Sequence, residues 1–165
     1  MLSSINHKIK KRDESKDIFY TPLNVVKIHL SLIDFFNNDK WLDPFYGEGI
    51  YYNNFPSNNK EWCEILKNKD FFDYNNDVDI ICSNPPYSIF DKVIEKSIEL
   101  KPRIISYLIN INNLTTKRIE IFNNAGYGLK KIHMTKIYKW FGMSYIVVFE
   151  KGVQNCITYD RIIHK

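Results

Sequence analysis

Apolar residues along the chain follow two spacings, which indicate helices alternating with strands. Apolar positions three or four residues apart predict helices, whereas short apolar runs between turn residues predict buried strands. The helical spacing covers residues 22–36, 50–55, 88–100 and 114–124. The strand-like runs cover residues 40–45, 61–65, 70–74, 78–83, 103–109, 129–139 and 144–151. This order predicts an α/β sandwich with a largely parallel sheet, whose last two strands pair antiparallel at one edge.

Residues at the ends of these segments support their boundaries. Thr21 carries the hydroxyl of a helix N-cap, and Pro22 suits the first helical position. The prolines after Asn84 must stop strand pairing, because proline has no amide to donate. The segment from Glu64 to Asp70 is too short for a crossover helix, which takes about 10–12 residues. We therefore expect an abbreviated sheet in which this helix is missing.

The composition is that of one globular domain. The chain has 165 residues, of which 44% are apolar and 25% charged, so it can bury a single core and is not wholly disordered. Its apolar runs are far shorter than the roughly 20 residues that cross a bilayer, and no secretion signal precedes them. Three cysteines without metal-like spacing indicate reduced thiols: Cys63, Cys82 and Cys156. We expect an intracellular protein, cytoplasmic or nuclear, with no membrane partner and no metal.

The charge distribution permits a nucleic-acid partner without requiring one. The net charge is +4, and residues 1–17 are polar and basic. A solvated flexible leader is the favoured interpretation of residues 1–17, and an arm that contacts phosphates is the alternative. Residues 18–165 contain no repeat and no linker, which predicts a single domain.

Two segments that follow predicted strands carry the candidate chemistry, since ligands of open α/β sheets bind beyond the carboxyl ends of the strands. The first has glycines that allow a tight turn and let a ligand approach the backbone, and an Asp that accepts hydrogen bonds. Its sequence is Asp43-Pro44-Phe45-Tyr46-Gly47-Glu48-Gly49. A strand-to-helix turn without a ligand is the alternative interpretation.

The second segment is Asn84-Pro85-Pro86-Tyr87. Its two prolines leave carbonyls as the only backbone polar groups, Asn84 adds a side-chain acceptor, and Tyr87 adds a flat ring. This set suits a planar group that bears an NH2, with acceptors for its hydrogens and a surface on which it stacks. An ordinary proline turn is the alternative.

Together the two segments resemble the S-adenosylmethionine-dependent amino-methyltransferases, above all the DNA adenine-N6 methyltransferases. That family carries an Asp-Pro-Phe-x-Gly-x-Gly cofactor loop and an Asn/Asp-Pro-Pro-Tyr/Phe catalytic loop on a Rossmann-like sheet. Matching segments follow in the family's order over residues 19–87. The resemblance implies a class I methyltransferase sheet and S-adenosylmethionine as cofactor. It implies these cofactor-binding residues: Tyr20, Thr21, Asp43, Phe45, Gly47, Gly49, Glu64, Asp70 and Phe71.

The resemblance also assigns roles to these side chains. Thr21 binds the methionine carboxylate, and Glu64 binds the ribose hydroxyls. Asp70 binds the amino group of the cofactor adenine, on which Phe71 stacks.

The same resemblance implies how the second segment catalyses methyl transfer. Hydrogen bonds to the Asn84 side chain and the Pro85 carbonyl localise the lone pair of the adenine amine, so positioning replaces a strong base. Tyr87 stacks on a base that is swung out of its helix. The catalytic residues are therefore Asn84, Pro85, Pro86 and Tyr87.

Besides the short segment from Glu64 to Asp70, the chain departs from the family in two respects. Tyr46 and Glu48 stand where the family has small residues, and Glu48 places a negative charge near the methionine carboxylate. Residues 88–165 are accounted for by the remaining core elements, so no separate target-recognition domain fits. We expect either relaxed sequence preference or a protein partner that supplies recognition.

A late loop combines cations and rings near the sheet edge. In related enzymes such a loop helps to hold the flipped base. The candidate substrate-binding residues are therefore Lys136, Lys139, Trp140 and Phe141. Core packing is the favoured interpretation of the two aromatic residues. His29 and His133 have no partners at metal-ligand spacing, and we interpret both as structural.

The leading hypothesis is an adenine-N6 methyltransferase that acts on DNA. An RNA adenine methyltransferase is the nearest alternative, because the same loop binds the same base. A catalytically silent subunit that binds nucleic acid or a catalytic partner is the third. No residue distinguishes DNA from RNA or identifies a target sequence.

Overall fold

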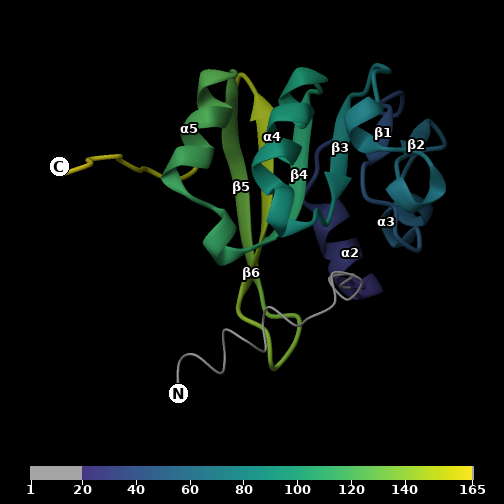
Figure 1. The fold of residues 1–165 in the computed structure, drawn as a ribbon, viewed down its shortest axis with the longest axis horizontal. Coiled ribbons are helices and arrows are strands. Elements are labelled where there is room, and N and C mark those ends of the chain that lie inside the picture. The colour runs from purple at the N-terminus through teal and green to yellow at the C-terminus, as the bar shows by residue number, and fades with distance from the viewer. Residues whose placement is uncertain (1–19, 165) are drawn as a thin grey trace.

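A mixed β-sheet runs through the centre of the protein in the computed structural model, which describes residues 20–164. Within this range the sheet has six strands in the order β2-β1-β3-β4-β6-β5 (Figure 1). The strands are β1 (Trp41–Asp43), β2 (Lys60–Trp62), β3 (Ile80–Ser83), β4 (Ile104–Asn110), β5 (Tyr127–Thr135) and β6 (Ser144–Lys151). Neighbours among β1–β4 pair parallel, and β6 pairs antiparallel with β4 and β5. The predicted parallel sheet with an antiparallel edge hairpin is confirmed.

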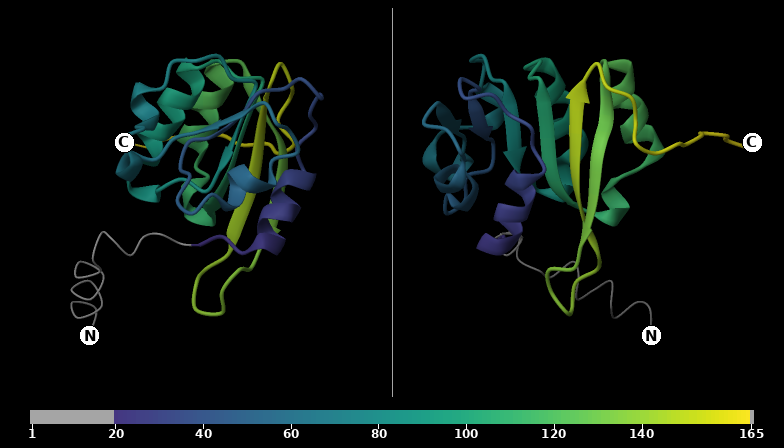
Figure 2. Two further views of the ribbon diagram at one scale, coloured as in Figure 1. Left: turned by 90° about the vertical axis from the view of Figure 1, so that its right-hand side faces the viewer. Right: turned by 180° about the vertical axis from the view of Figure 1, so that it is seen from behind.

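Helices cover both faces of this sheet. They are α2 (Leu23–Ser31), α3 (Ile50–Asn54), α4 (Phe90–Glu99) and α5 (Thr116–Asn124). The edge-on view in Figure 2 shows α4 and α5 on one face and α2 on the other. No helix in residues 20–164 is both long and apolar enough to cross a bilayer. The basic leader predicted at residues 1–17 lies outside the described residues.

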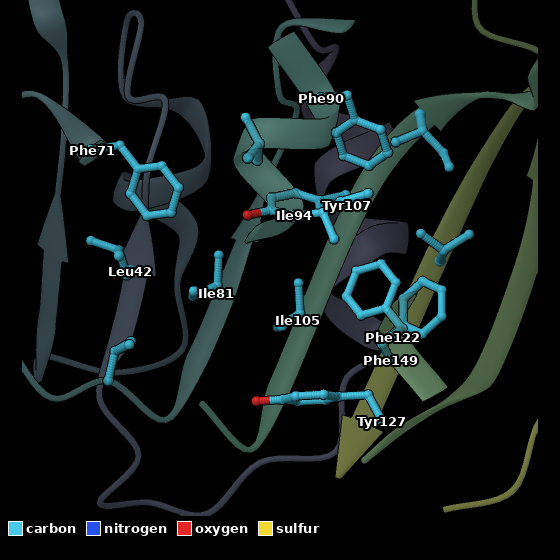
Figure 3. Close-up of a cluster of buried hydrophobic side chains, with 14 of the residues drawn as sticks. Leu42, Phe71, Ile81, Phe90, Ile94, Ile105, Tyr107, Phe122, Tyr127 and Phe149 are labelled. Atoms are coloured by element: carbon cyan, nitrogen blue, oxygen red, sulfur yellow. The ribbon is translucent and has the colours of Figure 1, made fainter. Parts of the chain in front are cut away.

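Alternating strand residues supply one hydrophobic cluster on each face, as the two-residue repeat of a strand requires. Leu42, Ile81 and Ile105 point toward α4 and α5, in the cluster drawn in Figure 3. Their chain neighbours Trp41 and Ile80 join the cluster under α2 and α3. Each such residue is almost completely buried and contributes about 1.5–3 kcal/mol of hydrophobic free energy.

The first helix begins later than predicted. Pro22 occupies the N-cap position of α2, and no side chain caps the helix. Thr21 does not cap it, and its side-chain oxygen instead accepts a hydrogen bond from Asn84 Nδ2. The helix also ends at Ser31, five residues earlier than the predicted end at residue 36.

The predicted strand at residues 70–74 is wrong. The chain forms a 3-10 helix there (Phe71–Asp73), because Asp70 Oδ1 accepts a hydrogen bond from the Phe72 amide at 2.9 Å and bends the backbone. Between β2 and β3 the described chain contains this turn, a second 3-10 helix (Ile65–Lys67) and an isolated bridge between Glu64 and Lys69, but no strand or α-helix. The sheet is therefore abbreviated, as the short spacing predicted, and it lacks the short strand as well as the helix.

Candidate functional site

The two predicted loops lie side by side because β1 and β3 are parallel neighbours in the sheet. Asp43 is the last residue of β1, and Ser83 is the last residue of β3. The Ser83 hydroxyl donates to Asp43 Oδ1 at 2.7 Å, which ties the loop after β1 to the loop that begins at Asn84. The candidate site is therefore at the carboxyl ends of these strands, where the fold predicts it.

Asp43 is fully buried at this point. Its Oδ1 also accepts a hydrogen bond from the Phe45 amide at 3.2 Å, whereas Oδ2 is buried and accepts no hydrogen bond of ordinary geometry among the described residues. Burial raises the pKa of Asp43 to about 7, although the Ser83 hydroxyl and the nearby backbone amides of Phe45 and Tyr52 oppose this shift. The site thus holds a buried acceptor that a cationic or donor group would satisfy.

The glycine turn adopts backbone conformations that favour glycine. Gly47 has φ +52° and Gly49 has φ +84°. A Cβ on Gly49 would lie 2.5 Å from the ring of Tyr46, so this ring packs directly on the glycine. The Gly47 amide donates to Glu64 Oε2 at 2.9 Å, which ties the turn to the chain after β2.

The two unusual residues of this turn have defined neighbours. The ring of Tyr46 lies 4.7 Å from that of Trp62, and the Lys67 ammonium lies 4.3 Å above it. Glu48 is exposed and forms a hydrogen bond with Tyr20 that raises the pKa of the Tyr20 hydroxyl. Within residues 20–164 the Glu48 carboxylate is therefore paired with a hydroxyl and forms no ion pair.

The remaining predicted cofactor residues differ in their access to solvent. Glu64 Oε1 accepts from the Leu66 amide at 3.2 Å, so each oxygen of this carboxylate holds one backbone amide. Phe71 is only 2% exposed and packs beside Leu42 in the core (Figure 3). The half-buried ring of Phe45 contacts it edge-on, with centroids 5.6 Å apart. The structure therefore brings Phe71 near the loop but places it beneath Phe45.

The loop Asn84-Pro85-Pro86-Tyr87 borders a small pocket. Asn84 Nδ2 donates to Thr21 Oγ1 at 3.1 Å, and Pro85 is buried behind it. After Pro86, Tyr87 begins a short 3-10 helix (Tyr87–Ile89) that leads into α4. The pocket has a volume of about 20 Å³, enough for one water molecule. It is lined by Tyr20, Thr21, Pro22, Asn84, Tyr87, Leu108, Ile137, Tyr138, Phe141 and Ser144.

The loop between β5 and β6 closes this pocket. The Tyr138 hydroxyl donates to the Tyr20 carbonyl at 2.6 Å, and Phe141 lines the pocket. Trp140 is 64% exposed and stacks on Tyr138 with centroids 5.2 Å apart, so it does not pack in the core. Lys136 donates to the Phe141 carbonyl, whereas Lys139 is exposed at the turn.

Several side chains behind the loops were not assigned to the site from the sequence. Ser83 immediately precedes the loop that begins at Asn84, so its position in the sequence could have identified it. His29 is completely buried between the Tyr51 hydroxyl and the Ser106 hydroxyl, 2.8 Å from each. Burial lowers the pKa of His29 to about 3 and keeps the ring neutral. Its contacts join residues far apart in the chain, and no local pattern reveals them. Among the described residues, no three His, Cys, Asp or Glu side chains are grouped to hold a metal.

Comparison with known proteins identifies the fold. No family model and no curated protein matches the chain. A candidate class I S-adenosylmethionine-dependent methyltransferase from Listeria monocytogenes is similar in structure (TM-score 0.67, 14% identity, 98% of this chain and 70% of that one).

Two further solved structures are similar. One is a candidate RNA methyltransferase from Pyrococcus horikoshii (TM-score 0.66, 16% identity, 87% of this chain and 91% of that one). The other is a modification subunit of a candidate type I restriction enzyme from Vibrio vulnificus (TM-score 0.58, 12% identity, 93% of this chain and 49% of that one). The chain therefore has the fold of the class I S-adenosylmethionine-dependent methyltransferases.

Proposed function

We propose that the protein transfers a methyl group from S-adenosylmethionine to the exocyclic N6 amine of adenine in DNA. The observation that carries this proposal is the Asn84-Pro85-Pro86-Tyr87 loop at the end of β3, beside the buried carboxyl group of Asp43. One of the similar structures is named as a candidate RNA methyltransferase, and another as a modification subunit of a candidate type I restriction enzyme. Both names support a nucleic-acid substrate.

The residues present fit the proposed cofactor. The buried, unpartnered Asp43 Oδ2 offers an acceptor for its cationic amino group. Glu64 uses one lone pair of each oxygen on backbone amides and retains others for the ribose hydroxyls. The exposed Gly47 lets a ligand approach the backbone. When bound, the cofactor supplies a methyl group on an electrophilic sulfonium.

The chain's own residues position and activate the acceptor amine. Asn84 Nδ2 faces Thr21, so Oδ1 is the atom that accepts one amine hydrogen, and the Pro85 carbonyl accepts the other. These hydrogen bonds localise the nitrogen lone pair without removing a proton before attack. Tyr87 provides a half-buried ring on which the base stacks.

Transfer of a labelled methyl group tests this proposal. Unmethylated duplex DNA, single-stranded DNA and RNA are offered side by side, and the labelled base is identified after digestion. We expect label on adenine N6 in DNA. Asn84→Ala is expected to lower kcat about 10²–10³-fold, with the cofactor Kd changed less than about threefold. The exposed Asn124→Ala serves as the matched control.

Each other result contradicts the proposal in a distinct way. Label only in RNA favours the RNA methyltransferase. Label in no acceptor, with the cofactor shown to bind, favours a subunit that depends on a partner. Unchanged turnover in Asn84→Ala would exclude the assigned catalytic role of this loop.

A further inference from the structure

The turn that follows β2 is closed by its own hydrogen bonds. The Glu64 amide donates to the Lys69 carbonyl at 2.7 Å, and the Lys69 amide donates back to the Glu64 carbonyl at 3.1 Å. Between these bonds, Glu64 Oε1 accepts from the Leu66 amide at 3.2 Å. Residues 64–69, which we call the β2 turn, therefore form a fixed projection beside β2, the edge strand labelled in Figure 1.

Two lysines of the β2 turn lie over aromatic rings. The Lys67 ammonium is 4.3 Å from the centroid of the Tyr46 ring and 5.5 Å from that of Trp62. The Lys69 ammonium is 4.0 Å from the Trp62 centroid. Neither ammonium forms a salt bridge within residues 20–164. A ring attracts a cation but has no anionic oxygen, so both charges are held in place without being neutralised.

The carboxylates closest to these lysines in the chain bind other groups. Glu61 forms an ion pair with Lys40 at 2.8 Å. Glu64 accepts hydrogen bonds from two backbone amides, and Asp70 accepts one. The β2 turn therefore presents positive charge without a paired acid, which is the electrostatic character of a surface that binds phosphates.

The tip of the β2 turn is apolar. Ile65 is 66% exposed and Leu66 is 81% exposed, although the turn itself is closed. Proteins that bind nucleic acids combine these features, because cations contact the phosphates while apolar side chains pack against bases or wedge between them. A lysine pair alone would serve any polyanion, whereas the apolar tip favours one that carries flat apolar groups.

The position of the β2 turn also favours a nucleic acid. Trp62 is the last residue of β2, so the turn lies beyond the carboxyl end of this strand. Asn84 lies beyond the carboxyl end of β3, and both strands pair parallel with β1 between them. Two strand spacings amount to about 10 Å, so the turn lies along the same edge of the sheet as the proposed catalytic loop.

We propose that the β2 turn is a nucleic-acid contact, in which Lys67 and Lys69 bind phosphates and Leu66 packs against a base. The inference rests on the proposed function for the identity of the partner, but binding at this surface requires no methyl transfer. It gives the protein a contact with nucleic acid in the segment where the crossover helix is missing.

The salt dependence of DNA binding tests the lysines. A labelled DNA duplex is titrated with the protein at several salt concentrations, without cofactor. Each lost phosphate contact lowers the slope of log K against log salt concentration by about 0.9. For Lys67→Gln/Lys69→Gln we expect a slope lower by about 1.8 and an affinity about 60-fold lower at about 0.1 M salt. Lys92→Gln/Lys117→Gln removes the same charge from exposed positions of α4 and α5 and should leave the slope unchanged.

Leu66→Ser tests the apolar tip in the same titration. Loss of an apolar contact releases no counterion, so the affinity should fall about fivefold with the slope unchanged. Ile162→Ser is the matched control, because Ile162 is 73% exposed and lies near the C-terminus, at the opposite end of the molecule from β2 (Figure 1). Its affinity should equal that of the wild type.

An unchanged slope in Lys67→Gln/Lys69→Gln would overturn the inference, as would a wild-type protein that binds neither DNA nor RNA. If that variant keeps its DNA slope but loses binding to poly-L-glutamate, the partner of the turn is an acidic protein and the inference is wrong. The expected slopes in a protein that transfers no methyl group would overturn the proposed function and support the contact. Methyl transfer to adenine with an unchanged slope would do the reverse.

Discussion

At the scale of single residues, Asp43 is buried in a position that favours its protonated form. Its pKa of about 7 lies above the usual value of 3.8 because burial penalises the charge. Between about pH 4 and 7 the folded protein therefore binds a proton that the unfolded chain has released. The contribution of Asp43 to stability is full below about pH 4 and is lost as the pH rises to about 7.

Asp43→Asn is expected to remove this pH dependence. The free energy of unfolding of the variant, relative to the wild type, should rise by about 1.4 kcal/mol for each pH unit between about pH 4 and 7. Urea denaturation at half-unit intervals of pH measures this difference. The exposed Asp73→Asn shows what the same substitution does at the surface. A constant difference for Asp43→Asn would mean that Asp43 is charged throughout this range.

The difference must be measured against the wild type because His29 acts with the opposite sign. Its pKa is lowered by burial to about 3, so the unfolded chain binds the extra proton. The contribution of His29 is present above pH 6.5 and is lost as the pH falls toward 3. The two groups therefore oppose each other between about pH 4 and 6.5.

Local sequence indicated the loops of the site but not the side chains behind them. The glycines after Asp43 and the prolines after Asn84 restrict their own backbone, so their sequence alone identifies the turns. The partners of His29 lie 22 and 77 residues away, and only the packing of α2 on the sheet brings them together. The sequence also did not determine whether Phe71 lies in the core or in a cofactor site, because an aromatic ring suits both.

At the scale of elements, α5 begins with a capped turn. The Thr115 hydroxyl accepts a hydrogen bond from the Arg118 amide at 3.3 Å. Thr115→Ala is expected to lower the free energy of unfolding by about 1 kcal/mol, because it leaves a backbone amide without its partner. Thr116→Ala, one position into the helix, is the matched control and should cost less than half as much. Thermal denaturation followed by circular dichroism compares them, and equal losses would contradict the assigned cap.

Elements with a complete local signal were predicted correctly. The amphipathic spacing of α4 and the buried run of β4 both specify their own conformation, and the structure has both. The predicted strand at residues 70–74 was wrong because the Asp70 carboxylate accepts a hydrogen bond from the nearby Phe72 amide. This local interaction competes with strand pairing. The predicted Thr21 cap of α2 was also wrong, and the Thr21 side chain instead contacts Asn84, a distant partner that no local rule includes.

At the scale of the whole molecule, segments from opposite ends of the described chain close the pocket. Tyr20 precedes the first described helix, and Tyr138 lies in the loop between the last two strands, yet a hydrogen bond of 2.6 Å joins them. This hydrogen bond holds the loop between β5 and β6 against the pocket that Asn84 lines.

Tyr138→Phe is expected to loosen the loop. Loss of the hydrogen bond to Tyr20 should increase the rate of tryptic cleavage at Lys136 or Lys139 about fivefold, as an opening cost of about 1 kcal/mol predicts. Mass spectrometry of the fragments identifies the cut. Tyr159→Phe removes a hydroxyl contact with Asn123 instead and should leave this rate unchanged. Equal rates in the two variants would show that the hydrogen bond does not hold the loop.

The strand order has a consequence for synthesis of the protein. β6 follows β5 in the chain but lies between β4 and β5, so the apolar edge of β4 has no partner until residues 144–151 have left the ribosome. Ser144, the first residue of β6, also lines the pocket beside Asn84. A nascent chain that has reached the end of β5 therefore has both loops but an incomplete pocket and an unpaired edge on β4. An unpaired strand edge is a template for aggregation, and here it is covered only when β6 has been translated.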